Sequence, residues 1–463
     1  MGRMTDARRR GGLGVEIMRA GNGCHRALAP APSSPAPGLA SHRGLLAALA
    51  AVGLVIGAAG AGAQALFSPE TAADLYRGVT RLRSPESPYE FPGDNTGRWG
   101  MTYTKPTNLA MDLISTLVAE RSGLEPAAAA RRHIGRLVDG LEALETHAGI
   151  FPEFVRLEDG RVRAERQAGT IVYSALDSAW LHFALSLAEA RYKHDDAPLA
   201  SRVRAMLDLA DYSIFVDASF SFKHNVVVDA TSRRRRSRSP SGYDNANSEA
   251  RVTILYLVAT GRLSPAAWER VWFRWRSKER ERVAEGWRWN AFAELTGNVF
   301  FDELTLAPRS FGASHRGYLA AARRVTDRAG LELIGWGPSA TPANEDPEGY
   351  SDAYGLDRPE VATPYAAALL TTVEQTPATA ARSLTQMLRS AGNLSAPVPD
   401  AYDSRTGEVV NRRARSLNQN LLFLALNLAQ TRAVVARAPW YDRAAALLRT
   451  FDRRHALPSG PSR

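Results

Sequence analysis

Apolar residues recur at three- and four-residue spacing along most of the chain from residue 107 to residue 451. This spacing places apolar side chains on one face of a helix, whereas a half-buried strand alternates apolar and polar positions. The helical stretches come in consecutive pairs, which we place at 107–120 and 126–146, 174–191 and 199–212, 247–260 and 265–280, 290–306 and 314–328, 361–372 and 377–390, and 416–428 and 440–451. Strand-like alternation is confined to two short stretches, 219–228 and 332–335.

Six helical pairs predict an all-α fold, the (α/α)6 toroid, in which an inner and an outer ring of helices alternate along the chain. The spacing of the pairs is irregular and no sequence repeat is found, which argues against a simple solenoid. The longest predicted loops precede the first helix of a pair, at 146–173, 213–246, 281–290, 330–360 and 391–415. Because loops of this length in a compact domain usually carry function, we expect the functional site at the rim where these loops gather.

The first 65 residues have the composition of an export leader. Arg8-Arg9-Arg10 precedes a Pro/Ser-rich stretch and an apolar run, and Ala63-Gln64-Ala65 offers a small-x-small cleavage site. A membrane anchor is the alternative, but the run is rich in Gly and Ala and short of strong hydrophobes. We therefore expect an exported protein with no stable membrane anchor, made of a leader (1–65), a connective segment (66–106) and an (α/α)6 domain (107–455).

Charge and cysteine content exclude several classes of function. The net charge of +10 comes mainly from arginine, and about half of it lies in the leader. The arginine run at 232–240 is typical of a solvated loop rather than a nucleic-acid surface. The only cysteine, Cys24, lies in the leader, and the nine histidines show no HxxxH or HExxH spacing. We expect a monomer that uses no metal or cofactor and binds no nucleic acid.

Aromatic, acidic and amide side chains recur where the predicted loops meet the inner helices. The CH face of a sugar ring packs on Trp or Tyr, while carboxylates and amides bind its hydroxyls. The segment 336–355 is too polar and too rich in Gly and Pro for a core element, so we expect it to line the site. The candidate sugar-binding residues are Tyr103, Asn108, Trp180, Tyr243, Trp289, Trp336, Glu345, Tyr350 and Tyr354.

Three carboxylates are candidates for catalysis. Cleavage of a glycosidic bond needs one protonated carboxylic acid at the leaving oxygen and a second carboxylate as base or nucleophile. Glu249, Asp177 and Glu294 each lie near the start of a predicted inner helix. A helix N-terminus favours the ionised form of Glu249, so apolar lining or a neighbouring carboxylate has to raise its pKa if it is the acid.

Six motifs follow one another between about residue 107 and about residue 428: TNLAMDLI, YSALDSAWL, YDNANSEARVTILYLVATGRLSPAAW, WNAFAEL, WGPSATPANEDPEGYSDAYG and ATPYAAALL. In this order they resemble the glycoamylase-like domain of bacterial β-1,2-glucanases and cyclic β-1,2-glucan synthases. The resemblance implies an (α/α)6 fold and hydrolysis or transfer on a β-glucan, with inversion at the anomeric carbon. By position, Glu249 matches the general acid of the family, and Asp177 and Glu294 match acidic positions of its motifs.

The chain departs from the family in one place, because Asn418-Gln419-Asn420 stands where the family has an aspartate followed by Gln and Gly. If that aspartate is the base, Asp177, Glu294 or an acidic residue of Glu345-Asp346 substitutes, a different linkage is cut, or hydrolysis is lost. We expect an endo-acting glycoside hydrolase on β-1,2-glucan or a related bacterial glucan, with Glu249 as the acid and Asp177 ahead of Glu294 as the second carboxylate. The alternatives are a non-catalytic carbohydrate-binding protein and a transglycosylase on the same fold.

Overall fold

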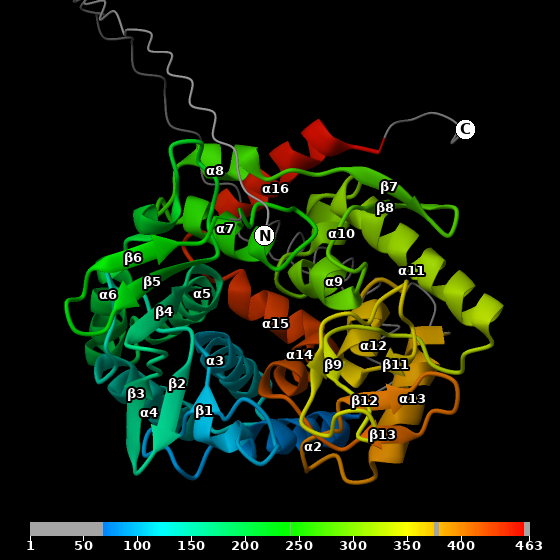
Figure 1. Ribbon diagram of the computed structural model, residues 1–463, viewed down its shortest axis with the longest axis horizontal. Coiled ribbons are helices and arrows are strands. Elements are labelled where there is room, and N and C mark those ends of the chain that lie inside the picture. Colours follow the sequence, from blue (N-terminus) through cyan, green and yellow to red (C-terminus); the bar gives the residue numbers. More distant parts are fainter. Residues whose placement is uncertain (1–67, 241, 375–378, 458–463) are drawn as a thin grey trace, which may run out of the picture. The chain divides into compact units, whose positions relative to one another are not determined.

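The computed structural model describes residues 68–240, 242–374 and 379–457, so the predicted leader lies outside the described residues. Helices make up nearly half of this part (Figure 1). They are α2 (Pro69–Thr80), α3 (Pro106–Arg121), α4 (Ala127–Glu142), α5 (Ala175–Tyr192), α6 (Ala197–Leu209), α7 (Ala250–Ala259), α8 (Pro265–Arg270), α9 (Ala291–Phe300), α10 (Glu303–Leu306), α11 (Phe311–Ala329), α12 (Pro364–Thr371), α13 (Thr379–Ala391), α14 (Ser416–Leu426), α15 (Leu428–Val435) and α16 (Tyr441–His455).

The helices α3, α5, α7, α9, α12 and α14 form the centre of the core. Each is buried along nearly its whole length, because its sequence is apolar or small on every side. α3 packs against α5 and α5 against α7, while α9 packs against α12, α12 against α14, and α14 returns to α3. α4, α11 and α13 bury one face only. α4 packs on α3, α11 on α9 and α13 on α12.

Most of the predicted helices are confirmed to within a few residues, but α15 was not predicted, and three further stretches differ. The helix predicted over 265–280 ends at Arg270, and the chain continues into a hairpin. The helix predicted over 290–306 is interrupted because Phe301 adopts an extended conformation (φ −121°, ψ 114°) between α9 and α10. In the segment expected to be connective, α2 begins at a Ser68 cap and packs against α14.

The all-α prediction, which allowed only two short strand-like stretches, is corrected by five small antiparallel sheets in the described part. Their orders are β1-β2-β3, β4-β5-β6, β7-β8, β9-β10 and β11-β12-β13. The strands are β1 (Tyr103–Thr104), β2 (Val155–Glu158), β3 (Arg161–Ala164), β4 (Thr170–Ser174), β5 (Asn225–Asp229), β6 (Arg235–Arg238), β7 (Trp275–Lys278), β8 (Glu281–Ala284), β9 (Ser339–Ala340), β10 (Tyr350–Ser351), β11 (Val361–Ala362), β12 (Ala401–Asp403) and β13 (Val409–Asn411).

One of the two predicted strands is present, the other is not, and the arginine run predicted to be a loop contains a strand. The stretch 219–228 yields β5, shifted toward its end, whereas 332–335 forms no strand and buries Leu333 and Ile334 in the core. The arginine run contains β6, which pairs with β5, and Arg236 forms an ion pair with Asp229. Strands of two to five residues are too short for their alternation to stand out in the sequence.

The small sheets lie where the long predicted loops enter the central helices. β4 runs directly into α5, and β4 and β5 both contact it (Figure 1). β11 ends two residues before α12, and β12 and β13 lie in the loop that leads to α14. The sheets therefore stiffen the segments that carry side chains to the N-terminal ends of the central helices. Searched over the described residues, none of the helices is both long and apolar enough to cross a membrane.

Candidate functional site

Glu249 lies at the N-cap position of α7, and its side chain makes no capping hydrogen bond. The preceding turn is held by its own polar groups. Asn245 Oδ1 accepts from the backbone N–H of Asn247 at 2.9 Å, and Ser248 Oγ donates to the Asn245 carbonyl at 2.6 Å. Tyr243 donates from its hydroxyl to Glu249 Oε1 at 3.4 Å. The turn thus fixes the backbone of Glu249 while its carboxyl is engaged by a single, long hydrogen bond.

Two half-buried carboxylates, Glu153 and Asp177, lie near Glu249, and we call these three residues and the cation Lys105 the acidic cluster. Burial, and next the negative charge of Asp177, raise the pKa of Glu249 to about 7, against the opposing effects of Lys105 and Tyr243. Burial and Asp177 also raise the pKa of Glu153 above its usual value. Like charges that share a site cannot all ionise at low cost. Glu249 therefore holds a proton close to neutral pH, despite its place at a helix N-terminus.

Asp177 reaches the acidic cluster from the first turn of α5. Ser174 caps this helix by accepting from the backbone N–H of Asp177 at 3.2 Å. Thr107, in the first turn of α3, donates from Oγ1 to Asp177 Oδ1 at 2.5 Å. Two neighbouring central helices thus present their N-terminal ends side by side, and the Thr107 contact fixes one Asp177 oxygen.

A second group of polar residues, which we call the Arg415 cluster, contains Asp94, Tyr350, Asp400, Arg415 and Asn418. Arg415 Nη2 donates to Asp94 Oδ2 at 3.1 Å, and its guanidinium lies 3.9 Å from the centre of the Tyr350 ring. Asn418 donates to Asp400 Oδ2 at 2.8 Å. Burial raises the pKa of Asp400 to about 7, although Arg415 and Asn418 act to lower it. A second carboxyl with a raised pKa therefore lies beside the asparagine that departs from the family.

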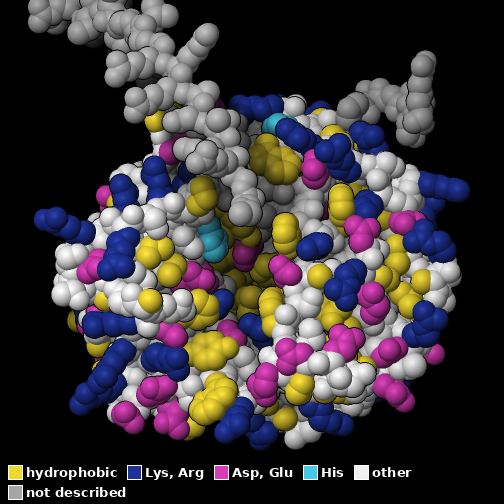
Figure 2. Space-filling model, viewed as in Figure 1, with side chains coloured by type: hydrophobic (Ala, Val, Ile, Leu, Met, Phe, Trp, Pro, Cys, Tyr) yellow, Lys and Arg dark blue, Asp and Glu magenta, His cyan; other side chains and the backbone are white. Residues whose placement is uncertain are grey.

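Tyr350 connects the two clusters. Burial raises the pKa of its hydroxyl, and the charges of Glu249 and Asp400 add to this effect while Arg415 opposes it. The side chain is 46% exposed, so it also faces solvent. The face of the described part drawn in Figure 2 is hollowed, with apolar, acidic and histidine side chains along the wall of the hollow. An aromatic ring that lies near both raised-pKa carboxyls can hold a ligand between them.

Four residues expected to bind sugar lie beneath the surface instead. Trp180 and Trp336 are 1% and 0% exposed, and Trp180 packs against Phe300 at 5.2 Å between ring centres. Trp336 begins the polar segment expected to line the site, yet its indole N–H donates to Ser404 within the core. Tyr354 is buried as well. Asn108 is also buried, and it donates to Asp94 Oδ1 of the Arg415 cluster at 3.1 Å.

The other predicted sugar-binding residues remain accessible. Tyr103 is half-buried and its hydroxyl donates to Asp94 Oδ2 at 3.3 Å, which places it against the Arg415 cluster. Trp289 is half-buried with Lys278 Nζ 4.0 Å from its ring centre. Glu345 is exposed in a turn, and its negative charge adds to the effect of burial in raising the pKa of Tyr354. Tyr103, Tyr243 and Tyr350 are thus the predicted aromatics that the structure brings together with Glu249 or Asp94.

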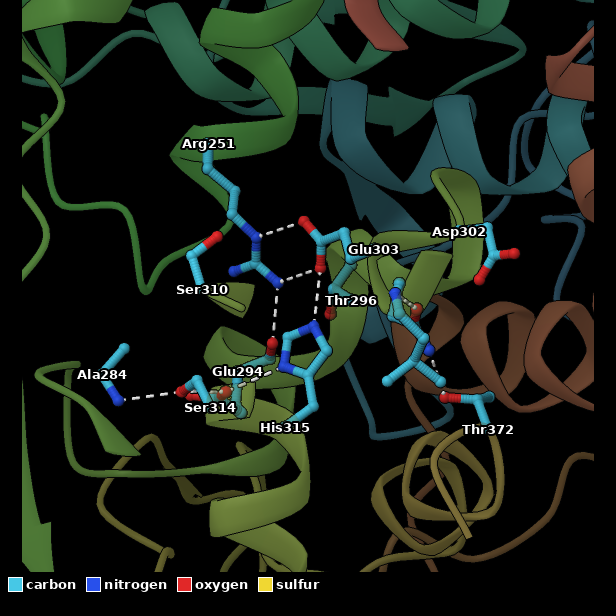
Figure 3. A network of polar contacts seen from close by, with 12 residues as sticks. Arg251, Ala284, Glu294, Thr296, Asp302, Glu303, Ser310, Ser314, His315 and Thr372 are labelled. Atoms are coloured by element: carbon cyan, nitrogen blue, oxygen red, sulfur yellow. Dashed lines mark hydrogen bonds and ion pairs between the residues drawn. The ribbon is translucent and has the colours of Figure 1, made fainter. Parts of the chain in front are cut away.

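Glu294 is 2% exposed and belongs to a buried polar network rather than to the open site (Figure 3). Its carboxylate accepts from Asn247 Nδ2 and Ser314 Oγ, both at 2.6 Å, and contacts His315 Nδ1 at 2.8 Å. Because Asn247 lies two residues before Glu249, Glu294 holds the turn that carries the proposed acid. We infer that Glu294 is a positioning residue, which differs from the catalytic role expected from its sequence position.

The network continues to Arg251 and Glu303. Arg251 donates from Nε and Nη2 to the two Glu303 oxygens at 2.8 and 3.0 Å, and from Nη1 to the Ala293 carbonyl at 2.6 Å. This bidentate pair joins α7 to α9 and α10 in the core. A Cβ on Gly297 would lie 2.7 Å from Arg251 Nε, so the guanidinium needs a glycine at this position.

His315 completes the charge balance of the network. Its Nδ1 faces Glu294 Oε1 at 2.8 Å and its Nε2 faces Glu303 Oε2 at 2.9 Å. Burial alone would lower the pKa of His315, but the hydrogen bonds to both carboxylates raise it above its usual value. Both ring nitrogens donate when the ring is an imidazolium. Two cations and two carboxylates then neutralise one another beneath the turn of Glu249.

The sequence analysis missed several residues of the site. Glu153, Lys105 and Arg415 occupy loop or cap positions, and no motif marked them. Asp400 lies in the predicted loop 391–415, eighteen positions before Asn418. The available signal for Asp400 was its place in a long loop before a central helix. No three His, Cys, Asp or Glu side chains come together as a possible metal site anywhere in the described ranges.

Comparisons with known proteins agree on the fold. No family model and no curated protein matches the chain. An endo-β-1,2-glucanase from Chitinophaga pinensis is 12% identical with a TM-score of 0.66, over 83% of this chain and 98% of that one. One from Talaromyces funiculosus is 12% identical with a TM-score of 0.66, over 84% and 90%. A Bacteroides uniformis protein provisionally named a glucoamylase is 13% identical with a TM-score of 0.65, over 82% and 95%.

At these identities the likeness establishes a shared helical fold, and function has to be argued from the site. The resemblance to the glycoamylase-like domain is thereby confirmed at the level of fold.

Proposed function

We propose that the protein is a glycoside hydrolase that cleaves β-1,2-glucan within the chain, on an (α/α)6 toroid whose inner ring is α3, α5, α7, α9, α12 and α14. The observation that carries the proposal is Glu249, a carboxyl with a pKa raised to about 7 beside Asp177. The return of α14 to α3 supports a closed ring. The solved structures of similar fold include endo-β-1,2-glucanases with sophorotriose and glucose or with sophorose bound. Export of the protein and its monomeric state remain predictions.

In the proposed reaction, Glu249 donates its proton to the glycosidic oxygen as the bond from that oxygen to the anomeric carbon breaks. A water molecule attacks the anomeric carbon from the opposite face, and its proton passes to the second carboxylate, which gives inversion. The aromatic rings of Tyr243 and Tyr350 both lie near Glu249 and hold the sugars by packing on their CH faces. This uses Glu249 in the protonated form, which burial and the charge of Asp177 favour.

The decisive test of this function is the release of reducing sugar from a panel of β-1,2-, β-1,3- and mixed-linkage glucans. We expect release from β-1,2-glucan, with short oligosaccharides of mixed length as the early products because the cut is internal. Separation of the products by size gives the measurement. Binding of the glucan without release would favour a non-catalytic carbohydrate-binding protein, and products longer than the substrate would identify a transglycosylase.

Asp177 is our proposed second carboxylate, and Asp400 is its competitor. We expect Asp177→Asn to reduce kcat/KM by about 10²–10⁴-fold, the usual contribution of a general base, and Asp400→Asn to reduce it by less than about tenfold. Loss of the Asp177 charge also removes a cause of the raised pKa of Glu249. Activity that needs protonated Glu249 falls as pH rises through that pKa, so the high-pH limb of the residual activity should move to lower pH.

The measurement is kcat/KM against pH for both variants, because this profile reports the acid and base of the free enzyme. Asp208→Asn is a matched control, since Asp208 lies on the outer helix α6 with 64% of its side chain exposed. A large loss in the Asp400 variant with near-normal Asp177 activity would assign the base to Asp400 instead.

A further inference from the structure

A pocket of about 430 Å³ opens beside the site, between the turn before β1 and the hairpin of β2 and β3. Its volume lies in the range of small-molecule pockets. It is lined by Trp99, Tyr103, Phe154, Arg156, Glu165 and Gln167. The proposed reaction uses none of these residues except Tyr103, whose hydroxyl faces the Arg415 cluster.

Trp99 is the most exposed part of this pocket, with 60% of its surface accessible. Its backbone is nevertheless fixed. The Trp99 carbonyl accepts from Thr102 Oγ1 at 2.8 Å and from the Thr102 backbone N–H at 3.1 Å, and the Gly100 N–H donates to Gly97. Single exposed apolar residues are ordinary on a protein surface. Three aromatic rings around one polar pocket are not, and an indole held in a rigid turn offers a flat surface at low entropic cost.

The polar groups of the pocket suit an uncharged ligand rich in hydroxyls. Arg156 donates to Glu165 at 3.0 Å and to Glu158 at 3.2 Å, so the charges in the wall neutralise one another. A guanidinium has five N–H donors, and those that Arg156 does not use for these contacts can bind hydroxyls. Glu165 supplies an acceptor and the exposed Gln167 amide supplies both kinds of group.

Two residues of the pocket wall contact the two clusters of the site. Tyr103 forms one wall and contacts Asp94 of the Arg415 cluster. Phe154 forms another wall, and Lys105 Nζ lies 4.5 Å from its ring centre. The positive charge of Lys105 in turn opposes the rise that burial causes in the pKa of Glu249. The pocket therefore lies next to both clusters, on the side of Tyr103 and Phe154.

We propose that this pocket is a distal subsite that binds a sugar of the glucan away from the bond that is cleaved, with Trp99 as its stacking surface. The proposal rests on the proposed function of the adjoining site and specifies how that site selects long chains. The subsite gives long glucan an advantage in affinity over a short oligosaccharide that occupies only the positions around Glu249.

The experiment measures binding by titration calorimetry on the full chain carrying Glu249→Gln, so that the sugar is not consumed. We expect Trp99→Ala on this background to raise the Kd of long β-1,2-glucan about tenfold, equivalent to about 1.4 kcal/mol, and the Kd of β-1,2-linked trisaccharide by less than about twofold. Leu209→Ala is the control, because Leu209 is a 68% exposed apolar residue on the outer helix α6. It should change neither Kd.

An equal rise in both Kd values, no rise in either, or no binding of long glucan would overturn the subsite. A melting temperature unchanged by Trp99→Ala shows that the effect is local, and Trp99→Phe should recover part of the affinity because it restores an aromatic face. The experiments distinguish a failure of the proposed function from a failure of the subsite. Trp99-dependent binding by a chain that releases no sugar would keep the subsite and reject the hydrolase, whereas sugar release without Trp99 dependence would reject the subsite alone.

Discussion

Glu249→Gln should abolish nearly all glucan hydrolysis while the protein remains folded. Glutamine keeps the size of the side chain and the contact with Tyr243, but it cannot donate the proton that the leaving oxygen needs. General acid catalysis contributes about 10²–10⁴-fold to a rate, and we expect kcat to fall by about 10³-fold or more. The measurement is initial rates of reducing-sugar release near neutral pH.

Stability provides a second readout for the same variant. The pKa of Glu249 is about 7 in the folded chain and 4.5 ordinarily, so the folded state binds this proton more tightly than the unfolded state. The resulting stabilisation is complete below about pH 4.5 and disappears as pH rises through about 7. Glu249→Gln removes this dependence, and at pH 8 the variant should be more stable than the parent by about 1 kcal/mol or more, since one pKa unit corresponds to about 1.4 kcal/mol.

Glu153→Gln is the matched comparison, because Glu153 is half-buried in the same acidic cluster and also has a raised pKa. Its activity should stay within about tenfold of the parent, because the loss of a general acid lowers the rate by at least about 10²-fold. Full activity in Glu249→Gln together with loss of activity in Glu153→Gln would move the acid to Glu153.

Arg251→Met should reduce the free energy of unfolding by about 3–5 kcal/mol, the usual result of removing one partner from a buried ion pair. Arg251 is 1% exposed and Glu303 is equally buried, so the variant leaves a carboxylate without its main cation. Burial alone would raise the pKa of Glu303, and the charge of Arg251 together with hydrogen bonds from Arg251 and His315 lowers it to about 2. Urea unfolding at neutral pH is the measurement.

Arg202→Met is the surface control for this prediction. Arg202 pairs with Asp139 and Glu142, all three side chains are more than a third exposed, and such pairs contribute about 0–1 kcal/mol. The Arg251 variant should also lose activity in its remaining folded fraction, because Arg251 holds the Ser248 carbonyl next to Glu249. A loss of stability no greater than that of Arg202→Met would show that the network adds little to the fold.

Local periodicity carries a large share of the fold. The central helices are apolar over two or more turns, so α3, α5 and α14 were predicted almost to their observed ends. The short sheets escaped prediction because strands such as Tyr350–Ser351 pair through the backbone with strands formed elsewhere, here Ser339–Ala340. A backbone hydrogen bond leaves no mark in the type of side chain. The polar segment 336–355 misled in part, since its Trp336 and Tyr354 turn into the core while Tyr350 stays exposed.

The sequence by itself determined the helical architecture and two of the three catalytic candidates that lie in the open site, Glu249 and Asp177. Both follow from local signals, namely apolar spacing and the acidic positions at the starts of helices. Only the tertiary structure decided that Glu294 is buried against His315, that Asp400 lies beside Asn418, and that burial together with Asp177 gives Glu249 the pKa of an acid. The physical reason is that desolvation and the interaction of charges depend on distances in space between segments far apart in the chain.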